Sequence, residues 1–375
     1  MERHEHTLKS GCLGTRRTVT SFHFGAPGGD KAYIQASLHA DELPGMLVAW
    51  YLKRELQQLE ADGHLSGEII VVPQANPIGH AQALLGQAIG RFELASGDNF
   101  NRHYPRLADG VYARVRTQLG ADAARNTRLI RAAIRAELAR REDASELDSL
   151  RTVLMSLAAD ADIVLDLHCD MHAALHVYTG TPLWEQCEPL ARLLGSSAQL
   201  LATESGDDPF DEACSQTWWT LLERCRADGL DAAIDMACLA VTVELRGQKQ
   251  VSHELASRDA AAILDFLRLR GLIHSDAAPL LPELRHPATP LAGSETLRAP
   301  FPGLVCFHVE PGTVVAAGQP IADIIDPLDD TLLTLSSAHG GMVYALDHHP
   351  YVMAGASVAK IATDHVIKSG KLLSA

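Results

Sequence analysis

Short apolar runs alternate with amphipathic segments from the N-terminus as far as residue 270. The apolar runs have the length of strands, and they occupy residues 18–24, 32–38, 68–73, 162–167, 174–179, 199–203 and 239–245. Segments with helical spacing follow several of them, at residues 45–59, 184–194, 218–227 and 252–270. This order of strands and helices predicts an α/β domain whose mixed, largely parallel sheet is flanked by helices.

Residues 107–159 form a helical segment that is unusually long for a connection. Arg and Glu recur along residues 128–141, as they do on the solvated face of an amphipathic helix. We therefore interpret the segment as a helical insertion packed on the sheet. The alternative is a lid or a partner-binding insertion, since the segment directly follows a loop of candidate site residues.

The pattern changes after residue 272, where Pro279, Pro282, Pro287 and Pro290 interrupt the helical spacing. Beyond them, short alternating runs are separated by Pro-Gly and Gly-Gly turns. This spacing predicts a small all-β unit. We divide the chain into residues 1–275 and 276–375.

The C-terminal unit resembles a lipoyl- or biotinyl-type barrel in residues 299–304 and 309–321, and residues 338–344 repeat the pattern. A working carrier of that type presents one Lys at a hairpin tip. Here the turn at 326–331 contains no Lys, and Lys360 lies near the closing strand. We expect a structural or pocket-covering barrel, not an acyl carrier.

The net charge of −15 argues against nucleic acid or an anionic membrane as the main partner. The seven cysteines are odd in number and form no Cys-x-x-Cys pair, which favours reduced thiols over disulfides or a structural zinc site. No signal peptide or membrane-spanning apolar run is visible, so a cytoplasmic protein is expected. The oligomeric state, including a homo-oligomer, stays open.

His39 and Glu42 stand at the junction between a predicted strand and a predicted helix. At this spacing, one imidazole nitrogen and one carboxylate can face a single cation, and zinc accepts both ligand types. The alternative is that Asp41 caps the helix and Glu42 is a solvated residue in its first turn.

A third ligand is expected at the end of another strand, and His168 follows the apolar run that ends at Leu167. Asp166 lies two residues earlier on the same face, where it can orient the ligands. His172 is a rival but lies past the strand. Cys169 points to the opposite face of the strand and is left out.

Two further segments carry candidate site residues. Glu244 lies within a β-branched run, where an unpaired carboxylate is costly and requires a partner. Asn101 and Arg102 are adjacent in a loop between Gly and Pro, and an amide beside a guanidinium can hold a carboxylate. An ordinary surface salt bridge is the alternative for that loop.

Taken together, these motifs resemble the succinylglutamate desuccinylase and aspartoacylase family, a branch of the zinc carboxypeptidase fold. The matching features, in the family's order, are His39-Ala-Asp-Glu42, residues 98–102, Asp166-Leu-His168 and Val241-Thr-Val-Glu244-Leu. The resemblance implies one zinc ion held by His39, Glu42 and His168, with Glu244 as the catalytic carboxylate. It also implies that Arg91, Asn101 and Arg102 surround the substrate.

The chain departs from the family pattern at two places. The segment Asp98-Asn-Phe-Asn-Arg102 has one extra residue, so the assignment of Asp98 depends on how that residue is accommodated. After Glu244, Leu-Arg-Gly-Gln stands where small residues are expected. Arg246 either faces the pocket and selects the substrate or neutralises a nearby acid.

The resemblance implies hydrolysis of an amide bond in a small, anionic N-acyl amino acid. Zinc would activate water, Glu244 would move its proton, and Arg91 would stabilise the developing oxyanion. Two alternatives stay open: a metallocarboxypeptidase acting on a short peptide, and a non-catalytic relative that binds a metal or metabolite.

Overall fold

The computed structural model describes residues 1–373, and its centre is a nine-stranded mixed sheet. In spatial order the strands are β1 (Glu2–Thr7), β2 (Thr18–Phe24), β4 (Glu68–Val72), β3 (Lys31–Ala36), β7 (Ile163–Asp170), β11 (Leu239–Gly247), β9 (His176–Gly180), β10 (Ala198–Ala202) and β12 (Thr289–Pro290). Strands β4, β3, β7 and β11 are parallel neighbours, as are β9, β10 and β12. The pairs β1–β2, β2–β4 and β11–β9 are antiparallel. The predicted mixed, largely parallel sheet is confirmed.

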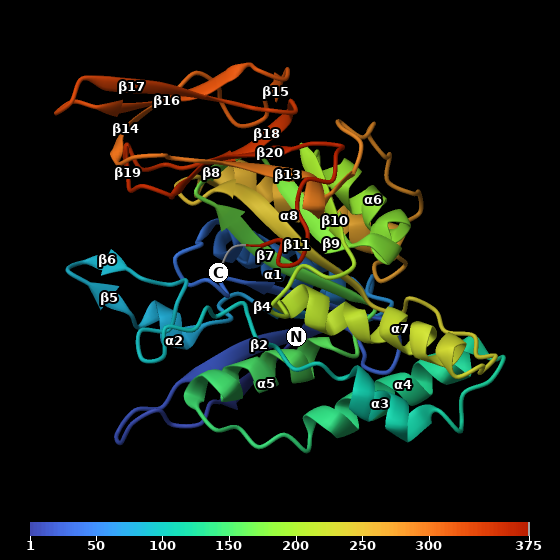
Figure 1. The fold of residues 1–375 in the computed structure, drawn as a ribbon. Coiled ribbons are helices and arrows are strands. Elements are labelled where there is room, and N and C mark those ends of the chain that lie inside the picture. The colour runs from blue at the N-terminus through green and yellow to red at the C-terminus, as the bar shows by residue number, and fades with distance from the viewer. Residues whose placement is uncertain (374–375) are drawn as a thin grey trace.

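Helices cover both faces of this sheet (Figure 1). One face carries α1 (Pro44–Ala61), α6 (Trp184–Leu194) and α8 (His253–Leu269), and the other carries α3 (Ala108–Val115), α4 (Ala123–Leu138), α5 (Glu146–Ala158) and α7 (Phe210–Ala227). Because successive strand residues point to opposite faces, β7 contributes Val164 to the core under α3, α4, α5 and α7 and Leu165 to the other core. Smaller elements are α2 (Pro77–His80), the 3₁₀ turn Thr181–Leu183 and the hairpin of β5 (Ala83–Leu84) and β6 (Gln87–Ala88).

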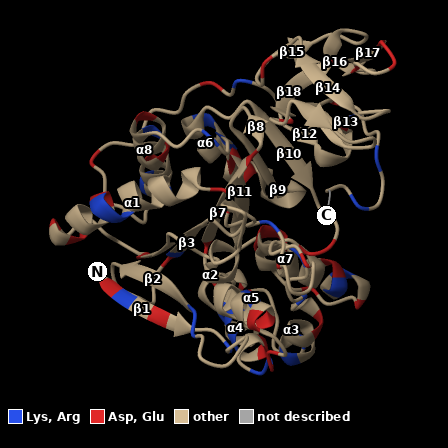
Figure 2. Cartoon of the chain, turned by 90° about the vertical axis from the view of Figure 1, so that its left-hand side faces the viewer, with Lys and Arg blue, Asp and Glu red and all other residues tan. Residues whose placement is uncertain are grey.

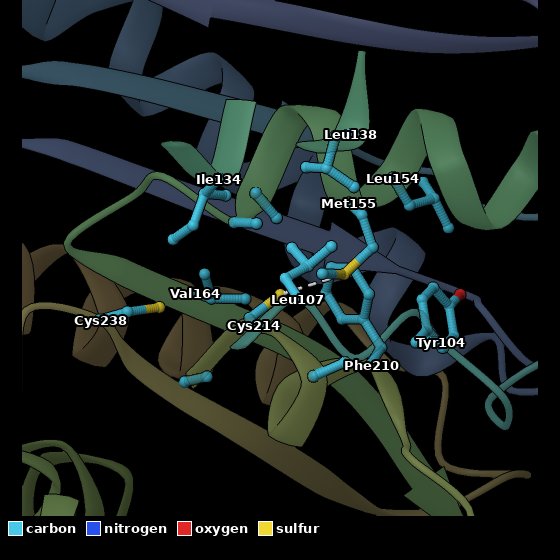
Figure 3. Packing of buried hydrophobic residues seen from close by; sticks show 14 of the residues in the cluster. Tyr104, Leu107, Ile134, Leu138, Leu154, Met155, Val164, Phe210, Cys214 and Cys238 are labelled. Atoms are coloured by element: carbon cyan, nitrogen blue, oxygen red, sulfur yellow. Dashed lines mark hydrogen bonds between the residues drawn. The ribbon is translucent and has the colours of Figure 1, made fainter. Parts of the chain in front are cut away.

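Figure 3 shows the first of these cores, where Leu138, Met155, Phe210 and Cys214 surround Val164 of β7. The thiol of Cys214 lies 3.7 Å from the sulfur of Met155. All seven cysteines of the chain are free thiols. Within residues 1–373, no helix has the length and apolar character needed to span a membrane.

The segment between residues 107 and 159 folds into the three helices α3, α4 and α5. A reciprocal capping box starts α5, where the Ser145 hydroxyl accepts from the Asp148 N–H and the Asp148 carboxylate accepts from the Ser145 N–H. Ile130 and Ile134 of α4 and Leu150 of α5 are buried in the core that Figure 3 shows in part. These apolar faces hold the three helices on the sheet.

The expectation that a helix opens at Trp218 was wrong, because α7 already begins at Phe210. The acidic residues Asp211 and Glu212 are both buried in the first turn of the helix. Acidic side chains are favoured at a helix N-terminus by the helix dipole. This early start brings the beginning of α7 against Asn101, whose side chain accepts from the Phe210 N–H at 2.8 Å.

The C-terminal unit consists of two antiparallel sheets (red and orange in Figure 1). One contains β13 (Ser294–Arg298), β20 (Ser357–Ala362), β18 (Gly341–Leu346) and β15 (Val314–Val315), and the other contains β17 (Thr331–Ser336), β16 (Pro320–Asp326), β14 (Gly303–Phe307) and β19 (Tyr351–Val352). The 3₁₀ turn Leu291–Gly293 precedes β13. Strand β8 (His172–Ala173), which follows β7 directly, pairs with β18 and joins the first sheet to the N-terminal part of the chain.

Candidate metal centre and active site

His39 and Glu42 lie in the loop that connects β3 to α1. Ser37 adopts a left-handed backbone with φ of 61°, which turns the chain away from the strand before His39. Gly45 lets α1 approach β7, because a Cβ at this position would lie 2.9 Å from the Cβ of Leu167. Helix α1 has no side-chain cap at its N-terminus, so Asp41 does not cap it. Glu42 is buried, which removes the solvated alternative.

The structure brings His39, Glu42 and His168 together as a buried group whose ligand atoms lie within 4.8 Å of one another. Glu42 bridges the two rings: its Oε1 lies 2.8 Å from Nδ1 of His39, and its Oε2 lies 2.7 Å from Nδ1 of His168. Burial alone would raise the pKa of Glu42, but the two histidines hold it well below its usual range. The group therefore favours an ionised carboxylate between two imidazoles.

The remaining ring nitrogens are held by two other side chains. Nε2 of His39 lies 2.9 Å from Oδ1 of Asn99, and Nε2 of His168 lies 2.9 Å from Oδ2 of Asp166. Gln35 donates in turn to the other oxygen of Asp166 at 2.9 Å. If both Nε2 atoms carry the proton, both Nδ1 lone pairs point toward Glu42. This is the arrangement in which a carboxylate or amide oxygen orients histidine ligands of a metal.

Glu244 stands beside this group on β11. It is paired with His168 on β7 and with His176 on β9, so the three side chains share one face of the sheet. Within the described part of the chain, its buried Oε2 has no hydrogen-bond partner. Burial, followed by the nearby charge of Glu42, raises the pKa of Glu244 to about 8. A carboxyl group with such a pKa can accept and return a proton near neutral pH.

Arg91 reaches the ligand group from the solvent side. Its Nη1 lies 3.5 Å from Oε1 of Glu42 and 3.4 Å from Nδ1 of His39, and its side chain is 38% exposed. The preceding Gly90 is essential to this approach, because a Cβ there would lie 2.1 Å from the backbone nitrogen of Asp41. The Gly90 carbonyl also accepts from the Ala40 N–H at 2.9 Å.

Asn101 and Arg102 lie deeper and are both buried. The Asn101 oxygen accepts from the Phe210 N–H, which directs its Nδ2 toward Nε2 of His168 at 3.4 Å. Arg102 donates from Nη1 to the Asn101 carbonyl at 2.7 Å. Burial, and then the charge of Arg91, lowers the pKa of Arg102. Arg91 thus places one cation beside the ligand group, and the buried Arg102 lies near Arg91.

Two candidate residues of the sequence lie elsewhere. The Asp98 carboxylate lies 3.4 Å from Arg151, and the neighbouring Asn99 takes the place beside His39. Of these two neighbours, Asn99 contacts the ligand group and Asp98 does not take that place. Arg246 forms a short ion pair with Asp259 of α8. Two roles were open for Arg246, and the ion pair with Asp259 corresponds to the second one, the neutralisation of a nearby acid.

Sequence reasoning also missed the position of Lys360. This residue lies on β20 of the C-terminal unit, and its Nζ lies 2.5 Å from Oδ2 of Asp170 at the end of β7. The charges of Lys360 and Asp170 both act on Glu244. The sequence places Lys360 only near the closing strand of the barrel, and no sequence signal connects it to Asp170, 190 positions earlier.

The catalytic-domain model of the succinylglutamate desuccinylase/aspartoacylase family matches residues 28–270, a span that contains the three ligand residues and Glu244. The chain belongs to this family. The family's two named activities are hydrolytic, so membership supports an enzyme of the desuccinylase/aspartoacylase type. None of the curated proteins compared with the chain matches it.

Solved structures of the family share the complete architecture. A candidate succinylglutamate desuccinylase/aspartoacylase family protein of Shewanella amazonensis is 27% identical, with a TM-score of 0.84 over 97% of this chain and 99% of its own. A related protein of Shewanella frigidimarina has the same TM-score at 24% identity, over 97% of each chain. The ectoine utilization protein EutE (DoeB) of Ruegeria pomeroyi, at 13% identity and a TM-score of 0.64 over 96% of this chain and 94% of its own, shares the fold.

Proposed function

We propose that the protein is a zinc-dependent amidohydrolase that removes the acyl group from a small N-acyl amino acid. The observation that carries this proposal is the meeting of two imidazole nitrogens and one carboxylate beside the separate carboxylate of Glu244. Two nitrogens and one oxygen form a ligand set suited to catalytic zinc, which leaves one position for water or substrate. The contacts of Asn99 and Asp166 with the outer ring nitrogens support the same assignment.

A zinc ion held by His39, Glu42 and His168 would supply Lewis-acid chemistry, which lowers the pKa of water and polarises an acyl oxygen. Glu244 removes the proton from the attacking water and returns it to the leaving amine. The pKa of Glu244 is raised to about 8. A cation bound nearby would lower this pKa and so favour the ionised carboxylate that acts as a base.

The arginines and Asn101 hold the substrate in this proposal. Arg91 is half-exposed next to Glu42, so its guanidinium can reach the oxygen of an acyl group that enters from solvent. Asn101 and Arg102 lie on the inner side and anchor a substrate carboxylate. In a chain with a net charge of −15, these two arginines provide the local attraction that an anionic substrate needs.

The test combines zinc content with turnover. The protein as purified is analysed for metal by mass spectrometry and assayed on N-acetyl and N-succinyl amino acids and on short peptides. We expect one zinc per chain, hydrolysis of at least one N-acyl amino acid, and retention of zinc without turnover in Glu244→Gln. Glu146→Gln, which changes a buried carboxylate on α5, serves as the matched control.

Two results would contradict the proposal. Bound zinc without turnover of any compound in the panel would indicate a binding protein. Turnover of peptides alone would indicate a carboxypeptidase.

The free thiols are consistent with the proposed cytoplasmic location.

A further inference from the structure

A cavity with a volume of about 640 Å³ lies between α6, α8 and the C-terminal unit. Four arginines line it, namely Arg192 of α6, Arg246 at the end of β11, Arg258 of α8 and Arg285 of the linker. The cavity has the size of small-molecule sites, which usually range from about 300 to 1,000 Å³. Figure 2 shows basic positions on α6 and α8 among the acidic ones that give the chain its negative charge. Four arginines around one cavity therefore stand out in a chain whose net charge is −15.

Arg246 has an unusual backbone. Its φ is 67°, and the pairing of β11 with β7 shifts register between Glu244 and Gly247. In a regular strand, Arg246 would share the face of Glu244. The bulge instead turns its side chain toward Asp259 of α8, on the opposite face of the sheet from Glu244. A left-handed conformation is strained for a non-glycine residue, and residues strained in this way cluster at active and ligand-binding sites.

The guanidinium of Arg246 is only partly satisfied by Asp259. The residue is 9% exposed, and its Nη2 forms the ion pair. Its buried Nε and Nη1 have no hydrogen-bond partner in residues 1–373. Buried donors are normally paired, because an unpaired donor has lost its hydrogen bonds to water without gaining others. A guanidinium with two spare donors at a cavity wall is suited to a carboxylate or phosphate oxygen.

The other arginines contribute to different degrees. Arg258 and Arg285 are exposed at the cavity rim. Arg192 is already engaged, since it donates to the carbonyls of Pro282 and Leu281. The acidic wall residues are Asp259, Glu283 and Glu310. Asp259 is paired with Arg246, and Arg258 and Arg285 are the exposed arginines at the cavity rim.

We propose that this cavity binds a small organic anion, carrying a carboxylate or phosphate group, through Arg246, Arg258 and Arg285. The site is separate from the metal centre, since Arg246 and Glu244 face opposite sides of the sheet. Its walls come from both halves of the chain: Arg258 and Asp259 lie on α8, and Glu310 and Gly312 belong to the C-terminal unit. A bound anion therefore contacts both halves at once.

The test is titration calorimetry of the full-length protein as purified, with inorganic phosphate and, separately, with succinate. We expect saturable binding of at least one anion at one site per chain. The double variant Arg258→Gln/Arg285→Gln should weaken this binding at least about tenfold, because it removes two charged donors. Arg140→Gln/Arg141→Gln, at the exposed end of α4 on the other side of the sheet, makes the same change in charge and should leave binding intact.

Arg246→Gln/Asp259→Asn supplies an independent arm, because it removes the deep guanidinium without leaving its acid unpaired. It should also weaken binding, with folding checked by the thermal midpoint. Three outcomes would overturn the proposal: no saturable binding of either anion below about 10 mM, unchanged affinity in both cavity variants, or binding lost in Arg91→Gln instead. The last result would place the anion at the metal centre. None of these measurements requires hydrolysis, so they stand apart from the test of enzymatic activity.

Discussion

Glu244 lies directly opposite His168 in the parallel pairing of β11 and β7. Residues at paired positions project from the same face, so the candidate base and a candidate ligand have a fixed relation that no loop has to supply. Both strands are central in the sheet and buried on both faces. The distance between the backbones of Glu244 and His168 is therefore set by two buried, hydrogen-bonded strands at the centre of the sheet.

The first prediction follows from this arrangement. Replacing Glu244 with Gln should lower kcat by about 10²- to 10⁴-fold, the usual contribution of a general base, while zinc content stays the same. Because burial disfavours the ionised side chain, the thermal midpoint at high pH should be unchanged or higher in the variant. A variant that loses zinc together with activity would show that Glu244 acts in metal binding.

Asn99 provides the second prediction. Asn99→Ala removes the oxygen that holds Nε2 of His39, and zinc affinity measured by competition with a chelator should fall about 10- to 100-fold. Asp98→Ala is the matched control, because Asp98 lies beside Asn99 in sequence but contacts Arg151. Equal losses in the two variants would mean that the loop as a whole is responsible, not the contact with His39.

The third prediction concerns the ion pair between Lys360 and Asp170. Lys360→Met leaves a carboxylate without its cation at the end of β7, and the unfolding free energy should decrease by about 3 kcal/mol. Lys360→Arg should recover most of it. Lys368→Met, which removes a lysine bonded to Thr296, should have a small effect. Full stability of Lys360→Met would show that the pair does not fasten the C-terminal unit to the sheet.

Asp211 gives a prediction about pH. Burial, followed by Glu212 and Asp166, raises its pKa from 3.8 to about 7, while His168 opposes the shift. Between these values, the folded protein holds a proton that the unfolded chain releases. The stability from this group is thus fully present below pH 4 and is lost as pH rises through 7.

Asp211→Asn should therefore match the wild type at low pH and exceed it above neutrality. The pKa of Asp211 rises from 3.8 to about 7, and 7 − 3.8 = 3.2. This change in pKa corresponds to at most about 4 kcal/mol of unfolding free energy. Chemical denaturation across this pH range measures it, with Asp329→Asn on the exposed β16–β17 turn as control. A constant difference between the two proteins at all pH values would contradict the assignment.

The sequence predicted the parts of the site that depend on local pattern. Strand and helix periodicity placed His39 and Glu42 at a strand-to-helix junction and His168 at the end of an apolar run. The choice of these three residues as a ligand set came with the family resemblance. The choice between Asp98 and Asn99 did not follow, because a one-residue insertion shifts the register of a loop that has no periodicity. Only the contact with the His39 ring identifies Asn99.

Long-range relations were the other limit. Lys360 meets Asp170 because β20, which carries Lys360, pairs with β18, and β18 in turn pairs with β8, an arrangement that no local pattern describes. The direction of Arg246 depends on a single left-handed residue in a strand that otherwise alternates regularly. The start of α7 was misjudged because its buried first turn carries two acids. In each case, tertiary contacts override the preference that the residue type shows by itself.

Strand β8 follows β7 directly and forms its ladder with β18. The hydrogen bonds of this ladder fix the height and tilt of the C-terminal sheets relative to the carboxyl end of β7. A fragment that stops at residue 270 would retain all three ligand side chains and yet leave β8 as a bare edge prone to self-association. A chimera that takes its last hundred residues from a relative would therefore fold only if β8 and β18 come from the same protein. The two parts of the chain depend on each other for a complete sheet.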